Sequence, residues 1–422
     1  MCQWHMFSTD RSGAETWECV ARSNPQAQTL QAMKGMKTLR SGRNRRKWIY
    51  VLLLMGLLGL SGCGSPSSAS VEMSSQTELV KTGSMELQYA ENFAVDYYED
   101  GYKMLTTLPD SKRYLIVPEG QPVPRGLDED VSILQEPLQN IYLVASGVMD
   151  MFASVDAVDQ IRFSGQKQEN WYIQTAKDAM AAGDMIYAGK YSKPDYELLV
   201  SEGCDLAIEN RMITHSPEVV EMLQSFDIPV MIEYSSYEQH PLGKVEWVKF
   251  FGALTGKEAE AEEAFAEQTE ILEKVESGEK TGKTIAFFYV TSNGLIQVRQ
   301  STDYIPKLIE LAGGRYIFED LEDSGSGRST LNMQVEDFYA GAKDADILIY
   351  NSSIDGGVTT LDELIGKCNI LKDFKALQEG QVYCTTNDMY QQSMAIGYLL
   401  QDMHTVLTDD DTAKLRYLFL LQ

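Results

Sequence analysis

Short apolar runs alternate with helical patterns over most of this chain, and the alternation predicts an α/β fold. The runs IYLVA at 141–145 and PVMIEY at 229–234 are as long as strands and mostly apolar. Continuous apolar strands separated by helices are typical of a parallel sheet that helices cover on both faces. In the first half of the chain we expect strands at 141–145, 185–188, 205–209 and 229–234, and helices at 147–154, 171–181, 194–202 and 216–225.

A second series of the same kind begins with the run TIAFFYV at residue 284. Its expected strands are 284–290, 295–299, 313–318, 346–351 and 381–385, and its expected helices are 303–312, 333–342, 360–376 and 392–407. The predicted fold class is therefore α/β, with two Rossmann-like lobes of parallel-rich sheets at 86–242 and 279–422.

Residues 243–278 form the longest helical pattern of the chain and lie between the two lobes. Trp247, Phe250 and Leu254 recur near helical spacing, and Gly256 is the candidate for a break. A helix of about 35 residues at ~1.5 Å per residue would span ~50 Å, which exceeds one small domain. We therefore expect one long α-helix to join the lobes.

The region ahead of the first series predicts a hairpin and a spacer. Tyr102–Leu108 and Arg113–Val117 are strand-like and flank a turn at 109–112 that contains proline, aspartate and serine. Residues 63–85 are rich in serine and poor in large apolar side chains, which is the composition of a flexible spacer.

A targeting signal precedes this spacer. Apolar residues 48–60 follow a basic stretch, and the segment closes on LSGC at 60–63, the order of a bacterial lipobox. The pattern predicts a lipoprotein signal peptide, removal of residues 1–62, and a lipid anchor on Cys63 at the extracytoplasmic face of the cell membrane. The alternative is an ordinary signal peptide or a short membrane anchor in which Cys63 is incidental.

Residues 1–32 fit no part of a signal peptide. They are polar and show neither helical nor strand periodicity, so we expect them to have no fold. The natural start of the chain is expected at Met33 or Met36, close to the basic segment.

The expected mature chain is strongly acidic. Removing residues 1–62 takes away nine of the 36 basic residues and three of the 62 acidic ones, so 27 basic and 59 acidic residues remain, a formal charge of −32. Binding to a phosphate backbone needs clustered cations, and no basic run follows Lys47. We therefore exclude nucleic acid as a partner, and we expect membrane attachment to come from the lipid on Cys63.

Cysteine usage does not indicate a disulfide scaffold. After processing, cysteines remain at 63, 204, 368 and 384, and only the last two are close in sequence. One disulfide between Cys368 and Cys384 stays open. Cys204 begins an apolar run, and we expect it to be a small buried residue.

Signatures of catalysis and of metal capture are absent from the sequence. It contains no G-x-S-x-G, H-E-x-x-H, P-loop or G-x-G-x-x-G motif, and we do not expect an enzyme. His215, His240 and His404 are widely spaced, whereas zinc and manganese sites usually cluster imidazoles, so no metal site is expected. His240 lies at the start of the long helix, where we expect a structural role.

Ligand residues are expected where parallel strands end, because open α/β sheets bind ligands beyond these ends. The loops there hold tyrosine, arginine, asparagine, serine and methionine, which suits an organic ligand of mixed polarity, with carboxylates or a chelated metal. Arg211 could fix an anionic group or balance the acidic surface. Tyr191 and Tyr390 could line the site, ligate ferric iron through phenolate, or simply pack. The candidate ligand-binding residues are Tyr191, Lys193, Arg211, Tyr234, Asn293, Arg299, Asn351 and Tyr390.

Three segments of the chain carry a family resemblance. The first segment begins with AGKYSKPDYELLVSEGCDLAIEN at residue 188 and runs to residue 234; it contains a loop, an acidic helix and two strands, in that order. The other two are YIPKLIELAGGRYIFED at 304–320 and MQVEDFYAGAKDADILIYN at 333–351. Together they resemble the class III substrate-binding proteins of ABC importers, which serve ferric siderophores, haem and vitamin B12. The resemblance covers roughly residues 110–405.

The resemblance implies a monomeric, lipid-anchored receptor that traps a chelate of iron or cobalt, has no cofactor of its own, and delivers the chelate to an ABC permease dimer with a cytoplasmic ATPase. Its docking carboxylates correspond to Glu197 and Glu336, although a carboxylate near a helix N-terminus also stabilises the helix dipole. Lys190 intervenes before Tyr191, where the haem branch has its axial tyrosine, which argues against haem ligation. The rival hypotheses are an extracytoplasmic lipoprotein enzyme that acts on cell-envelope glycans or peptides, and a sensory or adhesive lipoprotein.

Overall fold

The computed structural model describes residues 3–9, 15–20, 79–321, 329–352 and 357–422, and the chain divides into two compact units, Met1–Ser74 and Ser75–Gln422. In the first unit, β1 (Gln3–Thr9) and β2 (Glu15–Val20) pair as an antiparallel hairpin. Our expectation that residues 1–32 have no fold is wrong for these two segments, because a hairpin needs only local backbone pairing. The predicted signal segment and Cys63 lie outside the described residues. Among the described residues, no helix is both long and apolar enough to cross a membrane.

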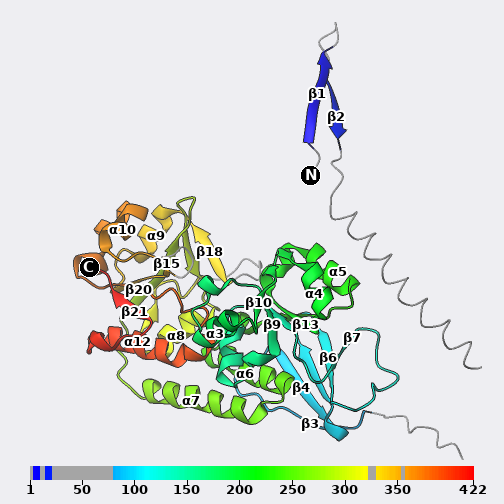
Figure 1. The fold of residues 1–422 in the computed structure, drawn as a ribbon. Coiled ribbons are helices and arrows are strands. Elements are labelled where there is room, and N and C mark those ends of the chain that lie inside the picture. Colours follow the sequence, from blue (N-terminus) through cyan, green and yellow to red (C-terminus); the bar gives the residue numbers. More distant parts are fainter. Residues whose placement is uncertain (1–2, 10–14, 21–78, 322–328, 353–356) are drawn as a thin grey trace, which may run out of the picture. The chain divides into compact units, whose positions relative to one another are not determined.

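The second unit opens with a five-stranded sheet, drawn in blue to cyan in Figure 1. The predicted hairpin is confirmed as β5 and β6, while the other three strands escaped prediction. β6 and β7 are parallel and the remaining pairs are antiparallel. The strands, in spatial order, are β3 (Lys81–Ser84), β4 (Phe93–Tyr98), β5 (Lys103–Thr107), β6 (Lys112–Val117) and β7 (Val131–Gln135).

The first lobe is built on a wholly parallel sheet of order β10-β9-β8-β13-β14. Its strands are β8 (Ile141–Leu143), β9 (Ile161–Ser164), β10 (Ile186–Tyr187), β13 (Leu206–Asn210) and β14 (Val230–Glu233). Its helices are α2 (Val148–Ser154), α3 (Gln174–Ala182), α4 (Tyr196–Glu202) and α5 (Pro217–Ser225). Leu199 of α4 and Leu223 of α5 pack on one face of the sheet and Phe152 of α2 on the other, so helices cover both faces as predicted.

The second lobe carries a seven-stranded sheet whose parallel part runs β17-β15-β19-β20. β16, β18 and β21 join it antiparallel at its margins. The strands are β15 (Thr284–Val290), β16 (Ile296–Arg299), β17 (Arg315–Tyr316), β18 (Thr330–Met333), β19 (Ile347–Tyr350), β20 (Val382–Thr385) and β21 (Leu418–Leu420). The helices are α8 (Tyr304–Leu311), α9 (Val335–Ala342), α10 (Leu361–Lys367), α11 (Lys375–Gln378) and α12 (Ile396–Thr408). The predicted α/β class with two parallel-rich lobes is thus confirmed.

The single connecting helix expected at 243–278 is wrong, because two helices replace it. α6 (Pro241–Thr255) ends at Gly256, whose φ of +72° is left-handed, and α7 (Glu258–Glu276) starts a new direction. A Cβ on Gly252 would lie 2.6 Å from the Cβ of Ala261, so the helices approach closely just after the turn. α6 contacts α2 of the first lobe and α8 and α12 of the second, while α7 packs on α12 (Figure 1).

Buried carboxylates of this connecting region hold the chain that leads into β4. Glu246, which is fully buried in α6, accepts hydrogen bonds from the backbone N–H groups of residues 88–90 at 2.8–3.1 Å. Glu238 accepts those of residues 91 and 92 at 2.9 and 3.0 Å. His240 Nδ1 accepts the N–H of Leu242, and its ring stacks on Tyr89 at 4.5 Å, which is the structural role expected of it.

Among the described residues, the cysteines of the second unit, Cys204, Cys368 and Cys384, are thiols and not halves of a disulfide. Cys368 and Cys384 lie in one apolar cluster of the second lobe and do not form the disulfide that the sequence left open. Cys204 is half-buried against the core of the first lobe rather than fully buried.

Candidate functional site

The ends of the parallel strands place candidate residues at one edge of each sheet. In the first lobe the strand order reverses between β8 and β13, which are followed by residues 146–147 and by Arg211. In the second lobe the order of the parallel strands reverses between β15 and β19, which are followed by residues 291–293 and 351–352. Such reversal points are where open α/β sheets bind ligands.

Arg299, Asn351 and Tyr390 form the closest group among the predicted ligand residues. Arg299 ends β16, Asn351 follows β19, and Tyr390 lies in the loop after β20. The phenolic oxygen of Tyr390 accepts hydrogen bonds from Arg299 Nη2 and from Asn351 Nδ2, the latter at 2.6 Å. The guanidinium carbon of Arg299 also lies 5.6 Å from the centre of the Tyr390 ring. Donors of two residues that are distant in sequence therefore meet at the phenolic oxygen of a third.

Arg299 is 8% exposed and is held from several sides. Its Nη1 lies 3.3 Å from the Oδ2 of Asp303, and its backbone N–H donates to the hydroxyl of Tyr316 at 3.0 Å. Burial raises the pKa of Asp303, and the charge of Arg299 opposes that rise. Burial also raises the pKa of Tyr390, so the phenol is uncharged at neutral pH. The group thus combines a guanidinium, an amide and a neutral phenol.

Two charged residues of the same buried region, Lys244 and Glu233, are not among the ligand residues predicted from the sequence. Lys244 lies near the start of α6, with its Nζ 4.6 Å from the centre of the Tyr304 ring, and Glu233 ends β14 and accepts from the N–H and hydroxyl of Ser235 at 2.8 and 2.6 Å. Burial lowers the pKa of Lys244 and raises that of Glu233, and attraction between the two opposes both shifts. The available signal was a lysine near the start of a helical pattern that is rich in large apolar residues.

Arg211 and Tyr234 form a second group around Tyr237 in the first lobe. The guanidinium carbon of Arg211 lies 4.5 Å from the centre of the Tyr237 ring, and the rings of Tyr234 and Tyr237 meet edge to face at 6.4 Å. Tyr234 is buried, whereas Arg211 is half-buried and supplies the more accessible polar atoms. This arrangement suits a planar or anionic ligand group.

Tyr191 and Lys193 lie in a tight hairpin of β11 (Gly189–Lys190) and β12 (Lys193–Pro194). Gly189 has a φ of +90°, and a Cβ there would lie 2.3 Å from the carbonyl oxygen of Lys193, so the turn requires glycine. The hydroxyl of Tyr142 in β8 donates to the carbonyl of Gly189 at 2.8 Å and fixes the hairpin to the sheet. Tyr191 is half-buried and Lys193 exposed.

The remaining predicted residues are exposed. Asn293 lies in the turn between β15 and β16, where its Oδ1 accepts from the hydroxyl of Thr291 at 2.6 Å. Glu197 and Glu336, the two docking candidates, are exposed and lie in the first turns of α4 and α9. Asp195 caps α4 through the N–H of Leu198, so Glu197 is not needed for that cap.

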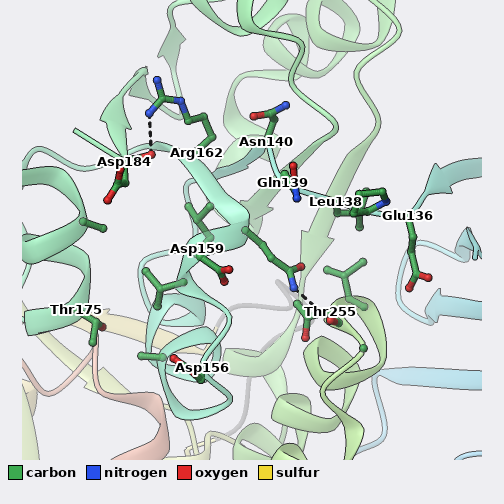
Figure 2. Close-up of a pocket in the computed structure, with 18 of the residues that line it drawn as sticks. Glu136, Leu138, Gln139, Asn140, Asp156, Asp159, Arg162, Thr175, Asp184 and Thr255 are labelled. Atoms are coloured by element: carbon green, nitrogen blue, oxygen red, sulfur yellow. Dashed lines mark hydrogen bonds between the residues drawn. The ribbon is translucent and has the colours of Figure 1, made fainter. Parts of the chain in front are cut away.

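A hollow of about 1100 Å³ lies elsewhere, beside the amino ends of β8 and β9 (Figure 2). Arg162 at its rim donates to the carbonyls of Gly183 and Asp184 at 2.8 and 2.7 Å. None of the predicted ligand residues lines it, and its charge disfavours an anionic ligand. Its charged lining residues are Glu119, Glu136, Asp156, Asp159, Asp178, Asp184 and Arg162.

Within the described residues, no group of three or more His, Cys, Asp and Glu side chains is arranged to hold a metal ion. The candidate groups at Arg299 and Arg211 offer hydrogen-bond donors and aromatic rings instead. They suit recognition of the outer atoms of an organic ligand.

Comparison with known proteins shows the fold. No protein-family model matches the chain. Two uncharacterized lipoproteins of Methanocaldococcus jannaschii are 24% identical over 396 residues (85% of this chain, 92% of the relative) and 23% identical over 367 residues (82% and 90%). A periplasmic haem-binding protein of Vibrio cholerae superposes with a TM-score of 0.51 at 14% identity, covering 63% of this chain and 98% of that one. A possible iron-binding periplasmic protein of Staphylococcus epidermidis gives 0.50 at 16% (64% and 98%), and a petrobactin-binding protein of Bacillus subtilis gives 0.50 at 12% (64% and 92%). The chain has the fold of these periplasmic binding proteins.

Proposed function

We propose that this chain is a lipid-anchored solute-binding protein of an ABC importer. In this proposal it captures a metal chelate, namely a ferric siderophore, haem or a cobalamin-like compound, between its two lobes and passes it to the permease. The observation that carries the proposal is that Arg299, Asn351 and Tyr390 meet beside the carboxyl end of β19, in a molecule with the periplasmic binding protein fold.

The chemistry of this group supports a ligand with exposed oxygen atoms. A guanidinium and an amide both donate hydrogen bonds, and such bonds are stronger when the acceptor is an ionised oxygen, as in the carboxylate, hydroxamate or catecholate groups of many chelates. Aromatic rings such as that of Tyr390 add apolar contact. Among the fold neighbours, one binds haem, one binds petrobactin and one is a possible iron-binding protein, which agrees with this class of ligand.

We propose that the lobes move little during capture. Residues 241–254 of α6 are all buried, and α6 contacts elements of both lobes. A wide hinge motion would break this packing, whereas a small shear would preserve it. The connection between the lobes consists of α6 and α7. It therefore resists bending because α6 packs on both lobes, and not because of the length of a single helix.

A thermal-shift panel tests ligand capture directly. Purified mature chain is mixed with ferric hydroxamate and catecholate siderophores, haem, cobalamin and free divalent metals. One chelate should raise the unfolding midpoint, because a ligand at a hundred times its Kd adds about 2.7 kcal/mol to the free energy of unfolding. Asn351→Leu should reduce that shift, and Asn332→Leu, at the exposed position of β18, should not. No shift with any chelate would contradict the proposal.

Docking and anchoring are tested in cells. We propose that Glu197 and Glu336 contact the permease and that the lipid on Cys63 keeps the protein beside it. Alanine at both glutamates should leave chelate affinity intact and abolish uptake, because the side chains are exposed on helix first turns. A loss of affinity would show that these residues belong to the ligand site instead.

A further inference from the structure

Residues 388–395, here called the strap, fasten the second lobe to the first. Gln391 Oε1 accepts the N–H of Tyr172 at 2.8 Å, and its Nε2 donates to the carbonyl of Asn170 at 2.8 Å. The N–H of Met394 donates to Oδ2 of Asp150 in α2 at 2.7 Å. All three hydrogen bonds join this short segment of the second lobe to residues of the first lobe.

Gly147 shows how closely the strap approaches. A Cβ at this position would lie 2.8 Å from Oγ of Ser393 and 3.2 Å from the carbonyl oxygen of Tyr390, and both atoms belong to the strap. The backbone of Gly147 is helical, with φ −70° and ψ −21°, so any residue can adopt it. A methyl group here would therefore press on the strap without straining its own lobe.

The strap also covers the candidate ligand group, because Tyr390 is part of it. The Tyr390 hydroxyl takes up donors of both Arg299 and Asn351, and its ring lies beside the guanidinium. Tyr390 is half-buried, whereas Arg299, from which its hydroxyl accepts a hydrogen bond, is only 8% exposed. The phenolic oxygen thus occupies the donors that an oxygen of a ligand would use.

We propose that Tyr390 is an internal substitute for a ligand oxygen and that the strap is its latch, so that Arg299 and Asn351 are uncovered when the strap leaves the first lobe. The identity of the ligand rests on the proposed function, but the movement of the strap does not. An ionised ligand oxygen would replace the neutral phenol favourably, because charge-assisted hydrogen bonds are the stronger ones. A compound without an acceptor there would not replace the two hydrogen bonds that Arg299 and Asn351 make to Tyr390, at a cost in affinity. Tyr390 therefore selects for ligands that present an oxygen acceptor.

Phenylglyoxal, which modifies accessible guanidinium groups, measures the uncovering of Arg299 without any ligand. The full mature chain is labelled in its native state, and the modified peptides are quantified by mass spectrometry. Phenylglyoxal should label Arg299 several-fold faster than in wild type in two variants. Gly147→Ala pushes on the strap, and Gln391→Ala removes two of the hydrogen bonds of the strap. Arg299 should be labelled fastest in Tyr390→Ala. The exposed Arg315 is the internal reference and should react equally in all variants.

Gln174→Ala is the matched control, because it removes one exposed hydrogen bond, to Asp178, within the first lobe. It should label Arg299 at the wild-type rate. If Arg299 is labelled at the wild-type rate in both Gly147→Ala and Gln391→Ala, the proposal that the strap is a latch is wrong. Faster labelling in Tyr390→Ala alone would overturn it too, since the cover would then be independent of the strap. If Gly147→Ala does not fold, Gln391→Ala decides. A failed chelate panel would leave this result standing, so the two proposals fail separately.

Discussion

Glu209 is buried in the first lobe, and neither of its carboxylate oxygens has a hydrogen-bond partner among the described residues. It lies in β13, on the face where Tyr142 and Leu199 form an apolar layer. Burial raises its pKa well above the usual value. A carboxyl group in this position costs stability whenever it must ionise.

Glu209→Met should therefore stabilise the protein. The pKa of Glu209 in the folded state lies above the unfolded value of about 4.3, so the native state holds the proton more tightly. The free energy of unfolding of the wild type therefore falls as pH rises from the unfolded pKa to the folded pKa. The variant escapes that loss. We expect a gain of roughly 1–3 kcal/mol in urea denaturation, larger at pH 8 than at pH 5. Glu221→Met, on the exposed side of α5, should change little at either pH. An equal gain at both pH values would contradict the ionisation argument.

At the candidate site, sequence reasoning could locate residues but not their contacts. Arg299, Asn351 and Tyr390 were predicted because they lie at or beyond the ends of apolar runs, and strand ends are visible in a hydrophobic pattern. Their shared oxygen was not predictable, because it depends on which strands are neighbours in the sheet. Lys244 was missed because a lysine in a helical pattern is usually solvated, and only packing from both lobes buries it.

Among the elements, α6 and α7 show where a periodic pattern misleads. Apolar residues continue at helical spacing on both sides of Gly256, and the pattern alone does not reveal a backbone reversal. Gly256 ends α6 in the left-handed conformation that glycine adopts most easily. The strands of the two lobes were predicted better, except for short ones such as β9, because continuous apolar runs bounded by polar turns have few other readings.

Gly256→Ala distinguishes one continuous helix from two helices separated at Gly256, because its effect on the free energy of unfolding has opposite signs in the two cases. In a continuous helix this substitution would stabilise the protein by about 1 kcal/mol, because alanine is the better helix former. At a left-handed helix end it should instead lower the free energy of unfolding by about 1 kcal/mol, since a Cβ is unfavourable there. Urea denaturation measures the difference. Gly366→Ala, inside α10 with no atom within 4 Å of the added Cβ, is the control and should stabilise. Stabilisation by both variants would restore the single helix.

On the scale of the whole molecule, the class of fold followed from the sequence and the joining of its parts did not. Two series of apolar strands and helices sufficed to predict two α/β lobes. The attachment of residues 88–90 to Glu246 and the hydrogen bond from the strap to Asp150 link positions more than 150 residues apart in sequence, and no local pattern encodes them. These long-range bonds join the sheet of β3–β7 to α6 and one lobe to the other, and they set how freely the molecule can open.

Asp150 makes one of these joints sensitive to pH. Burial between the lobes raises its pKa to about 6, while the N–H of Met394 and the charge of Lys244 oppose the rise. Tyr417 also lies close enough to interact with Asp150, and burial raises the pKa of its phenol to about 12, so it stays neutral and adds no charge below pH 10. Below pH 6 the uncharged carboxyl can still accept from Met394 through its carbonyl oxygen.

Stability should therefore fall as pH rises from about 4, near the unfolded pKa of aspartate, to about 6, and Asp150→Asn should remove this part of the fall. Asparagine keeps an acceptor oxygen for Met394 and cannot ionise, so the variant should match wild type near pH 4 and exceed it by about 1–3 kcal/mol at pH 7. Urea denaturation across pH 4–8 measures the two curves. Asp178→Asn, exposed on α3, should follow the wild-type curve throughout. Parallel curves for Asp150→Asn and wild type would mean that the carboxyl is already charged between the lobes at pH 4, and that Lys244 rather than burial controls it.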